Sequence, residues 1–208
     1  GAGAELGSAN VTGEILGGYL LTLGQPGDEI SPAARMAEFQ VGLDLLANNP
    51  SDASVQNDVL QRANSLVNSL NSAASALDRS RAQAADSFET SVAQVNDALS
   101  GIAALNKQLR GANSGTSGAG GLMDEMTRRL DALGEQMDFQ TRWEADGTLT
   151  LHTAGGTELV NGNDAAKLTA NGQTGALYAD GINITPGQTG GRGFTSGRLA
   201  GLSDMLSS

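Results

Sequence analysis

The sequence predicts an α+β protein, in which an elongated antiparallel helical bundle is built on one long helix and carries a small antiparallel β-hairpin unit. Between residues 52 and 110, apolar or small residues recur mostly at steps of three and four, which is heptad spacing. After residue 139 the period changes to two, which is typical of strands. Aromatic residues make up only 3% of the chain, so we expect a thin core of Ala, Leu, Val and Ile, which suits paired helices.

The first predicted helix begins at Ser31. Residues 1–30 before it are Gly-rich and weakly patterned, and we treat them as a separate N-terminal segment. Ser31 is a suitable N-cap, and Pro32 fits the first helical turn. Asn49 and Pro50 should end this helix, because proline cannot continue the hydrogen-bond ladder.

The long helix is predicted from Asp52, its N-cap, to Arg110, and would measure roughly 88 Å at the usual rise per residue. Asp58 and Arg62 stand four apart in the favourable acid-first order. The expected seam consists of Val59, Ala63, Leu66, Leu70, Ala73, Leu77, Ser80, Ala84, Phe88, Val92, Val95, Leu99, Ile102 and Leu109. From Ser80 to Val92 the steps are all four, as in a stutter, so the partner segment can change there.

The Gly-rich stretch at 111–121 is predicted to be a loop, and a third helix is predicted after it. Leu122, Met126, Leu130, Leu133 and Met137 fall on one face of this helix, and Glu125 and Arg129 form a four-apart pair on its surface. The loop is short, so we expect the third helix to fold back antiparallel onto the end of the long one.

The β unit is predicted from two hairpin signals. Asp146–Gly147 separates two alternating runs that begin at Phe139, and Asp180–Gly181 divides the segment 176–185 in the same way. A further strand is expected at 157–160. After a loop at 187–197, a last helix begins at Arg198.

These patterns divide the chain into four segments. They are the N-terminal segment 1–30, a helical bundle at 31–138, the β unit at 139–190, and a returning helix at 191–208 that packs on the bundle. The chain starts at Gly1 without Met and stops at Ser208 within a helical pattern, so we expect both ends to be cut from a longer protein.

Composition excludes several classes of partner. The net charge of −11 and the pI near 4.3 argue against nucleic acid and against an anionic membrane surface, both of which need clustered Lys and Arg. There is no cysteine for a disulfide, a thiolate metal site or a nucleophile. No apolar run has the length of a membrane span, and the first residues lack the basic and apolar regions of a secretory signal.

The residues that carry chemistry predict no catalytic, cofactor-binding or metal site. His152 is the single histidine, and no G-x-S-x-G elbow accompanies it, so we interpret it as a surface or partly buried structural residue. The Gly-rich loop lacks the phosphate-binding pattern. The pairs Asp124–Glu125 and Glu144–Asp146 lack calcium-loop spacing, and we assign them to a helix start and a turn.

Three remaining signals are short. Asn10 and Asn183 each begin a glycosylation acceptor triplet, a pattern that often arises by chance. Trp143 is expected to anchor the first hairpin against the helices. The exposed charges Arg81, Asp86 and Glu89 are candidates for contact with other molecules.

Several strings occur together in an order that resembles one family. They are LLANNPSD (45–52), LNKQL (105–109), LMDEMTRRLDAL (122–133), DGTLTL (146–151), GTELVNG (156–162) and GRLAGL (197–202). In this order the chain from about residue 28 resembles the family of flagellar hook-associated protein 1, the hook–filament junction protein. It departs from the family at 122–133, where the usual acid-rich DQRD core reads DEMT.

The resemblance implies a structural protein, not an enzyme, that leaves the cell through the flagellar type III apparatus. It would form a ring between hook and filament, with neighbouring copies and other axial proteins as partners. In that family the chain termini carry polymerisation, and an export chaperone would bind there, so this fragment is expected to be a monomer without cofactors.

Two other classes stay open. Hook-associated protein 3 and flagellin also carry long paired helices, but flagellins typically lack the DGTLTL-to-LVNG order. An adhesin-like or phage-tail module with a β tip on a coiled stalk would form a parallel trimer through 52–110. An enzyme would need a convergent pocket, and activity that depends on His152 would favour it.

Overall fold

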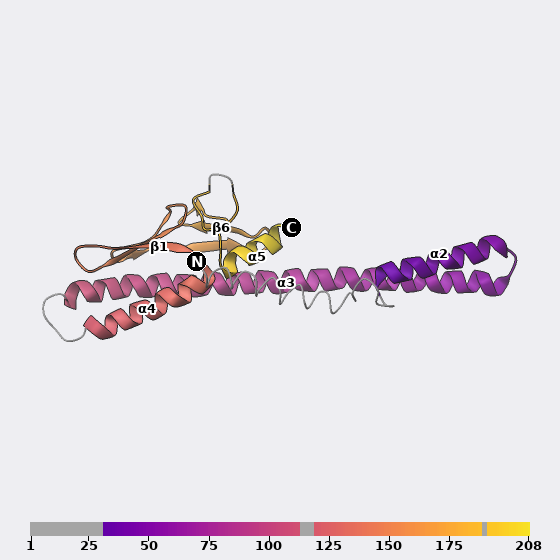
Figure 1. Ribbon diagram of the computed structural model, residues 1–208, viewed down its shortest axis with the longest axis horizontal. Coiled ribbons are helices and arrows are strands. Elements are labelled where there is room, and N and C mark those ends of the chain that lie inside the picture. The colour runs from indigo at the N-terminus through magenta and orange to yellow at the C-terminus, as the bar shows by residue number, and fades with distance from the viewer. Residues whose placement is uncertain (1–30, 113–118, 189–190) are drawn as a thin grey trace. The chain divides into compact units, whose positions relative to one another are not determined.

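The computed structural model describes residues 31–112, 119–188 and 191–208, and confirms the α+β class (Figure 1). Its helices are α2 (Pro32–Asn48), α3 (Ala53–Ala112), α4 (Ala119–Gln136) and α5 (Arg198–Ser207). Its strands are β1 (Phe139–Trp143), β2 (Leu149–Thr153), β3 (Glu158–Asn161), β4 (Asp164–Ala165), β5 (Leu168–Asn171), β6 (Ala176–Ala179) and β7 (Ile182–Asn183). The predictions for residues 1–30, including the Asn10 triplet, and for the middle of the Gly-rich loop lie outside the described residues.

The described residues fall into two units, and the boundary lies within α3. One unit contains residues 31–82 and the other contains the described residues from 83 onward. The boundary, between residues 82 and 83, lies within the predicted stutter at 80–92. The four segments predicted from sequence divide the chain differently and stay predictions.

In the unit 31–82, α2 packs antiparallel against the first part of α3. Ser31 caps α2 as predicted, because its side chain accepts a hydrogen bond from the Ala34 N–H at 3.2 Å. Asp52 does the same for α3, where its Oδ1 accepts from the Ser54 N–H at 2.8 Å. The predicted ends of α2 and the start of α3 are therefore confirmed.

The predicted seam is wrong in part of this unit. Val59 and Leu66 are buried, but Leu70 and Leu77 are 49% and 44% exposed. Arg62 donates to the Glu38 carbonyl, which fixes the antiparallel register of the two helices. Since α2 begins six residues before Glu38, it reaches only to about residue 68 of α3 and does not cover the later seam positions.

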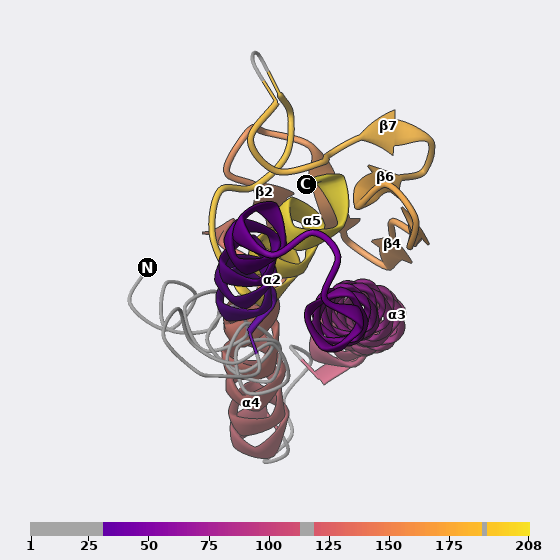
Figure 2. The same cartoon turned by 90° about the vertical axis from the view of Figure 1, so that its right-hand side faces the viewer.

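In the unit from residue 83, the seam of α3 is buried as predicted. Phe88, Val95, Leu99 and Ile102 have no exposed surface. Helix α4 runs antiparallel along this part of α3, since Gln136 bonds to Gln94 while Arg129 lies beside Asp97 (Figure 1). Figure 2 shows that α4 and the strands lie on different sides of α3.

The strands form two antiparallel sheets instead of one hairpin unit. Sheet A has the order β1-β2-β3-β4 and sheet B the order β5-β6-β7. Both predicted hairpins are confirmed; at the second turn, Asp180 and Gly181 have φ of 47° and 82°, the left-handed pair that a tight turn needs. Strands β4 and β5 were not predicted, because their short segments show no alternation of polar and apolar residues.

Helix α5 is the last element of this unit. Leu199, Leu202 and Leu206 are buried, and its approach is fixed by Asp138, whose Oδ1 accepts from the Thr195 and Ser196 N–H groups. The predicted core role of Trp143 is wrong, because its side chain is 47% exposed. It lies on β1, the edge strand of sheet A, where only one neighbouring strand can cover it.

Candidate assembly surface and its support

A fully buried amide fixes sheet A to α3. The Asn106 Nδ2 donates to the carbonyl oxygens of Leu149 and Gly162, both at 2.8 Å, and its Oδ1 accepts from the Leu149 N–H at 2.8 Å. Asn106 has no exposed surface. The side chain therefore pairs with the backbone of β2 as a neighbouring strand would.

Asn96 fixes sheet B in the same way, ten residues earlier on α3. Its Nδ2 donates to the Leu168 carbonyl at 2.9 Å, and its Oδ1 accepts from the Leu168 N–H at 2.7 Å. One helix thus positions both sheets through two amides. Neither amide was predicted from sequence. Asparagine is unfavourable inside a helix, so its placement beside the apolar seam is the signal that could have indicated a buried partner.

The β1–β2 turn carries a small charged network. Arg110 of α3 lies 3.1 Å from Asp146 Oδ2, while Asp146 Oδ1 accepts from the Thr148 N–H and hydroxyl. Glu144 accepts from the Arg142 Nε at 2.8 Å and from the Thr150 hydroxyl at 3.1 Å. The pKa of Glu144 is lowered, first by Arg142 and then by Thr150, and the pKa of Asp146 is lowered chiefly by Thr148, with Arg110 adding to it.

These lowered pKa values predict a loss of stability in acid. A carboxylate whose pKa is lower in the folded state stabilises the fold above its unfolded value, and this contribution disappears as the pH falls through the folded value. We therefore expect the urea midpoint to fall below a pH of about 4.5, near the ordinary range of Glu and Asp. Unfolding followed by the fluorescence of Trp143, the single tryptophan, measures it.

The matched variants are Glu144→Gln and Asp146→Asn, which remove the titrating groups. Each should flatten the decline of the midpoint between about pH 5 and pH 3. Asp124→Asn, on the exposed surface of α4, is the control and should keep the full decline. Equal pH profiles for all three variants would contradict an origin in the turn.

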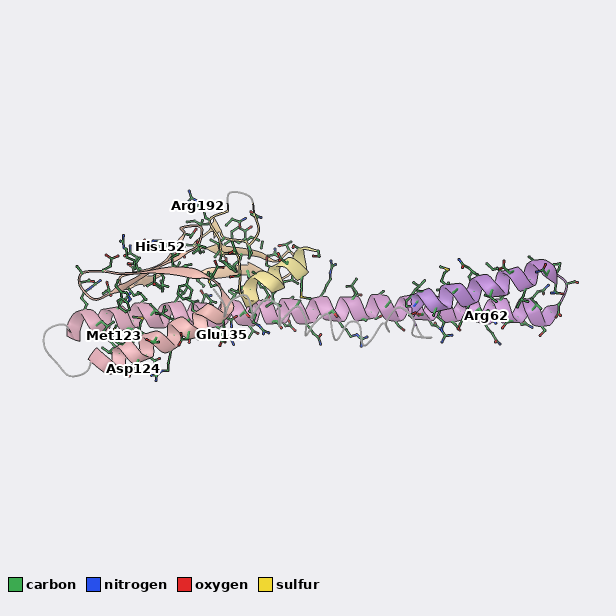
Figure 3. The ribbon with its side chains drawn as sticks, in the orientation of Figure 1. Arg62, Met123, Asp124, Glu135, His152 and Arg192 are labelled. Atoms are coloured by element: carbon green, nitrogen blue, oxygen red, sulfur yellow. The ribbon has the colours of Figure 1, made fainter. Side chains whose placement is uncertain are left out.

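A groove of about 730 Å³ runs between α3 and α4. We call it the α3–α4 groove. Buried apolar residues, Val95, Ala98 and Leu133, form its floor, and Asp97 and Glu135 line its edge. Figure 3 shows Glu135 near the last turn of α4 and Met123 and Asp124 near its first.

Arg129 crosses one end of this groove. It forms the predicted ion pair with Glu125 at 3.1 Å, and the space above Gly101 of α3 accommodates its guanidinium, which a β-carbon there would displace. The pKa of Glu125 is lowered, first by its hydrogen bond with Arg128, and Arg129 adds to this. The Gln136 Oε1 is buried, and among the residues that the structure describes it has no hydrogen-bond partner.

The candidate chemical residues do not converge. His152 lies 4.0 Å from Glu158 across β2 and β3, and its side chain is partly exposed, as predicted. Glu144 and Asp146 serve the hairpin turn, and Glu125 pairs with Arg128 and Arg129 on α4. Arg81, Asp86 and Glu89 are exposed.

The described ranges contain neither a metal-binding cluster nor a helix that could span a membrane. Residues 31–112, 119–188 and 191–208 contain no group of three or more His, Cys, Asp or Glu side chains placed to hold a metal ion. None of the helices in these ranges combines the length and apolarity that crossing a membrane requires.

Residues 22–208 match the model of the flagellar hook-associated protein FlgK helical domain. The chain belongs to the FlgK family. Over 143 residues, or 67% of the chain, it is 27% identical to flagellar hook-associated protein 1 of Escherichia coli K12. That alignment covers 26% of the relative's length, so the chain spans about a quarter of it.

A solved FlgK structure has the same fold. The flagellar hook junction protein FlgK from Burkholderia pseudomallei superimposes with a TM-score of 0.80 and 23% sequence identity. The match covers 98% of this chain and 38% of that one. The two sheets and the long helix of this chain are therefore features of a FlgK fold.

Proposed function

We propose that this chain is part of a structural component of the bacterial flagellum that joins hook to filament as one subunit of a ring. The observation that carries the proposal is the match of residues 22–208 to the FlgK helical domain. The relatives' own names, hook-associated protein 1 and hook junction protein, support the same role.

The function is mechanical and not enzymatic. Two amides on α3, the buried Asn106 and the partly buried Asn96, hold sheets A and B in a fixed arrangement, so load on either sheet passes into the helix through several hydrogen bonds. The partners are neighbouring copies and other axial proteins. An export chaperone binds elsewhere on the longer protein. The protein acts outside the cell, after flagellar export.

The alternative of an adhesin-like or phage-tail stalk is disfavoured by the packing of α3 against other parts of its own chain. Val59 and Leu66 lie on the face that packs on α2, and Asn96 and Asn106 carry sheets of their own chain. A parallel trimer through α3 would need these same faces. Another axial protein, hook-associated protein 3 or flagellin, is less favoured because the matching family model is that of FlgK.

The test is made in the bacterium that encodes the chain, with the whole gene. Deletion should leave hooks without filaments and place unattached filament protein in the medium, and the wild-type gene should restore attached filaments. Electron microscopy of cells and assay of the medium measure both. Filaments that stay attached in the deletion strain would refute the junction role.

A further inference from the structure

Two Asn–Gly pairs stand at the ends of strands. Asn161–Gly162 begins at the last residue of β3, and Asn171–Gly172 begins at the last residue of β5. Both asparagines are exposed. An asparagine before glycine is prone to lose its side-chain amide to water, because glycine has no side chain to shield its backbone nitrogen. Since the two pairs share sequence and exposure, their surroundings decide which one reacts.

The side chain of Asn171 is held by the loop that follows it. Its Oδ1 accepts from the Gln173 N–H at 2.9 Å and from the Thr174 N–H at 3.2 Å. Its main-chain carbonyl accepts from the Thr174 N–H at 3.2 Å and from the Gly175 N–H at 2.9 Å. The side chain must break two hydrogen bonds before its amide carbon can reach the Gly172 nitrogen, which slows the reaction there.

The side chain of Asn161 is held less firmly. Its Nδ2 donates to the Glu158 Oε2 at 3.0 Å, an exposed bond, and among the described residues this is its single hydrogen bond. In the same part of the chain, the Gly162 N–H donates to no acceptor. The following strand, β4, has two residues and is an edge of sheet A, so this end of the hairpin opens locally at low cost.

The main chain at Gly162 is held from α3. Its carbonyl oxygen accepts from the Nδ2 of the buried Asn106 at 2.8 Å. An attack of the Gly162 nitrogen on Asn161 needs the peptide group between them to rotate, and this rotation pulls the Gly162 carbonyl away from Asn106. The hydrogen bond from α3 and the reaction at Asn161 therefore oppose each other.

We propose that Asn161 is a site of spontaneous deamidation and that Asn106 controls its rate. The Gly162 nitrogen attacks the Asn161 Cγ. A new N–Cγ bond forms, the Cγ–Nδ2 bond breaks, and ammonia leaves with the proton of the Gly162 N–H. Water then opens the cyclic imide. Cleavage of the new bond gives aspartate, and cleavage of the original peptide bond gives isoaspartate, in which the main chain runs through the side chain.

The products loosen the attachment of sheet A. Each one puts a carboxylate at residue 161, close to Glu158, where the amide now donates a hydrogen bond, and like charges repel. Isoaspartate also lengthens the main chain by one carbon before Gly162, so the Gly162 carbonyl no longer lies against Asn106. Sheet A then depends on the two remaining bonds between Asn106 and Leu149.

Incubation of the purified chain at mildly alkaline pH tests the site, because trypsin places Asn161 and Asn171 in separate peptides, 143–167 and 168–192. Mass spectrometry should show that Asn161 converts several-fold faster than Asn171. Asn161→Gln should abolish conversion of the first peptide, since the longer glutamine side chain cyclises far more slowly. Conversion that persists in this variant would place the reaction at Asn163, and an Asn171 as fast as Asn161 would also overturn the proposal.

Variants of α3 test the control of the rate. Asn106→Ala should speed the conversion of Asn161 several-fold and leave Asn171 unchanged. Asn96→Ala removes the corresponding amide from sheet B, and should leave Asn161 at the wild-type rate. If Asn106→Ala speeds both peptides equally, the reaction follows opening of the whole unit, and if it changes neither, Gly162 is not restrained. Both results contradict a control by Asn106.

The stability of the product is measured separately. Anion exchange isolates the deamidated chain through its added negative charge, and its urea midpoint should lie below that of the unmodified chain. The decrease should be smaller in the Asn106→Ala background, where the bond to Gly162 is already lost. Equal midpoints for the modified and unmodified wild-type chains would refute the loosening of sheet A. None of these measurements depends on the junction role.

Discussion

Replacing Asn106 by Ala should lower the free energy of unfolding by about 3 kcal/mol, because a buried group left without its hydrogen bond costs about 1–3 kcal/mol. The change leaves the Leu149 N–H and two carbonyl oxygens without their partner in a site closed to water. Urea unfolding of the purified chain, followed by the fluorescence of Trp143, gives this value by linear extrapolation.

Two variants on the same helix are the controls. Asn96→Ala removes a partly buried amide with two hydrogen bonds, and should cost less, about 1–2 kcal/mol. Gln108→Ala changes an exposed residue of α3 and should stay within about 0.5 kcal/mol of wild type. A loss below about 1 kcal/mol for Asn106→Ala would mean that water replaces the amide and that sheet A does not depend on it.

Replacing Gly197 by Ala should destabilise the unit from residue 83 by roughly 2–4 kcal/mol, since a left-handed backbone and an overlap with main-chain atoms both oppose the change. Gly197 has a φ of 113°, a conformation that L residues with side chains rarely adopt. A β-carbon there would approach the Gln136 carbonyl oxygen and the Met137 Cα, which belong to the backbone and cannot rotate away. The start of α5 must therefore move away from the end of α4.

Gly121→Ala is the matched change for this prediction. A β-carbon on Gly121 meets nothing within 4 Å, and the residue lies in α4, where alanine favours the helix by up to about 1 kcal/mol. The same urea experiment should therefore give opposite signs for the two variants. A wild-type midpoint for Gly197→Ala would contradict the close approach of the Gly197 backbone to Gln136 and Met137.

Local signals predicted most of the secondary structure. Ser31, Asp52 and the two Asp–Gly turns each act on their immediate neighbours, so their effect can be inferred without knowing the fold. The seam prediction from Leu70 to Leu77 is wrong for the opposite reason. Heptad spacing shows that a face is apolar, but the reach of its partner depends on the length of α2 and its register on α3.

The hydrogen bonds that fix the sheets to α3 could not be predicted, because they join residues that are far apart in the sequence. Asn106 bonds to residues 43 and 56 positions later, and nothing in the local sequence of Leu149 or Gly162 requires an amide there. The exposure of Trp143 was not predicted. The strand pattern indicates that Trp143 shares a face of the sheet with Leu149, but it does not show that β1 is an edge strand. The Glu125–Arg129 pair could be predicted because both residues lie on one helix, four positions apart. The groove beside it could not, because it forms only where α4 packs on α3.

The two amides on α3 also restrict how the sequence can change in length. Asn96 and Asn106 belong to one continuous helix, so one residue inserted between them would turn one amide by about 100° relative to the other and shift it by about 1.5 Å. Sheets A and B could not then both keep their bonds to Leu149 and Leu168. Insertions and deletions among related chains should therefore collect in the connections between strands and be absent from residues 97–105.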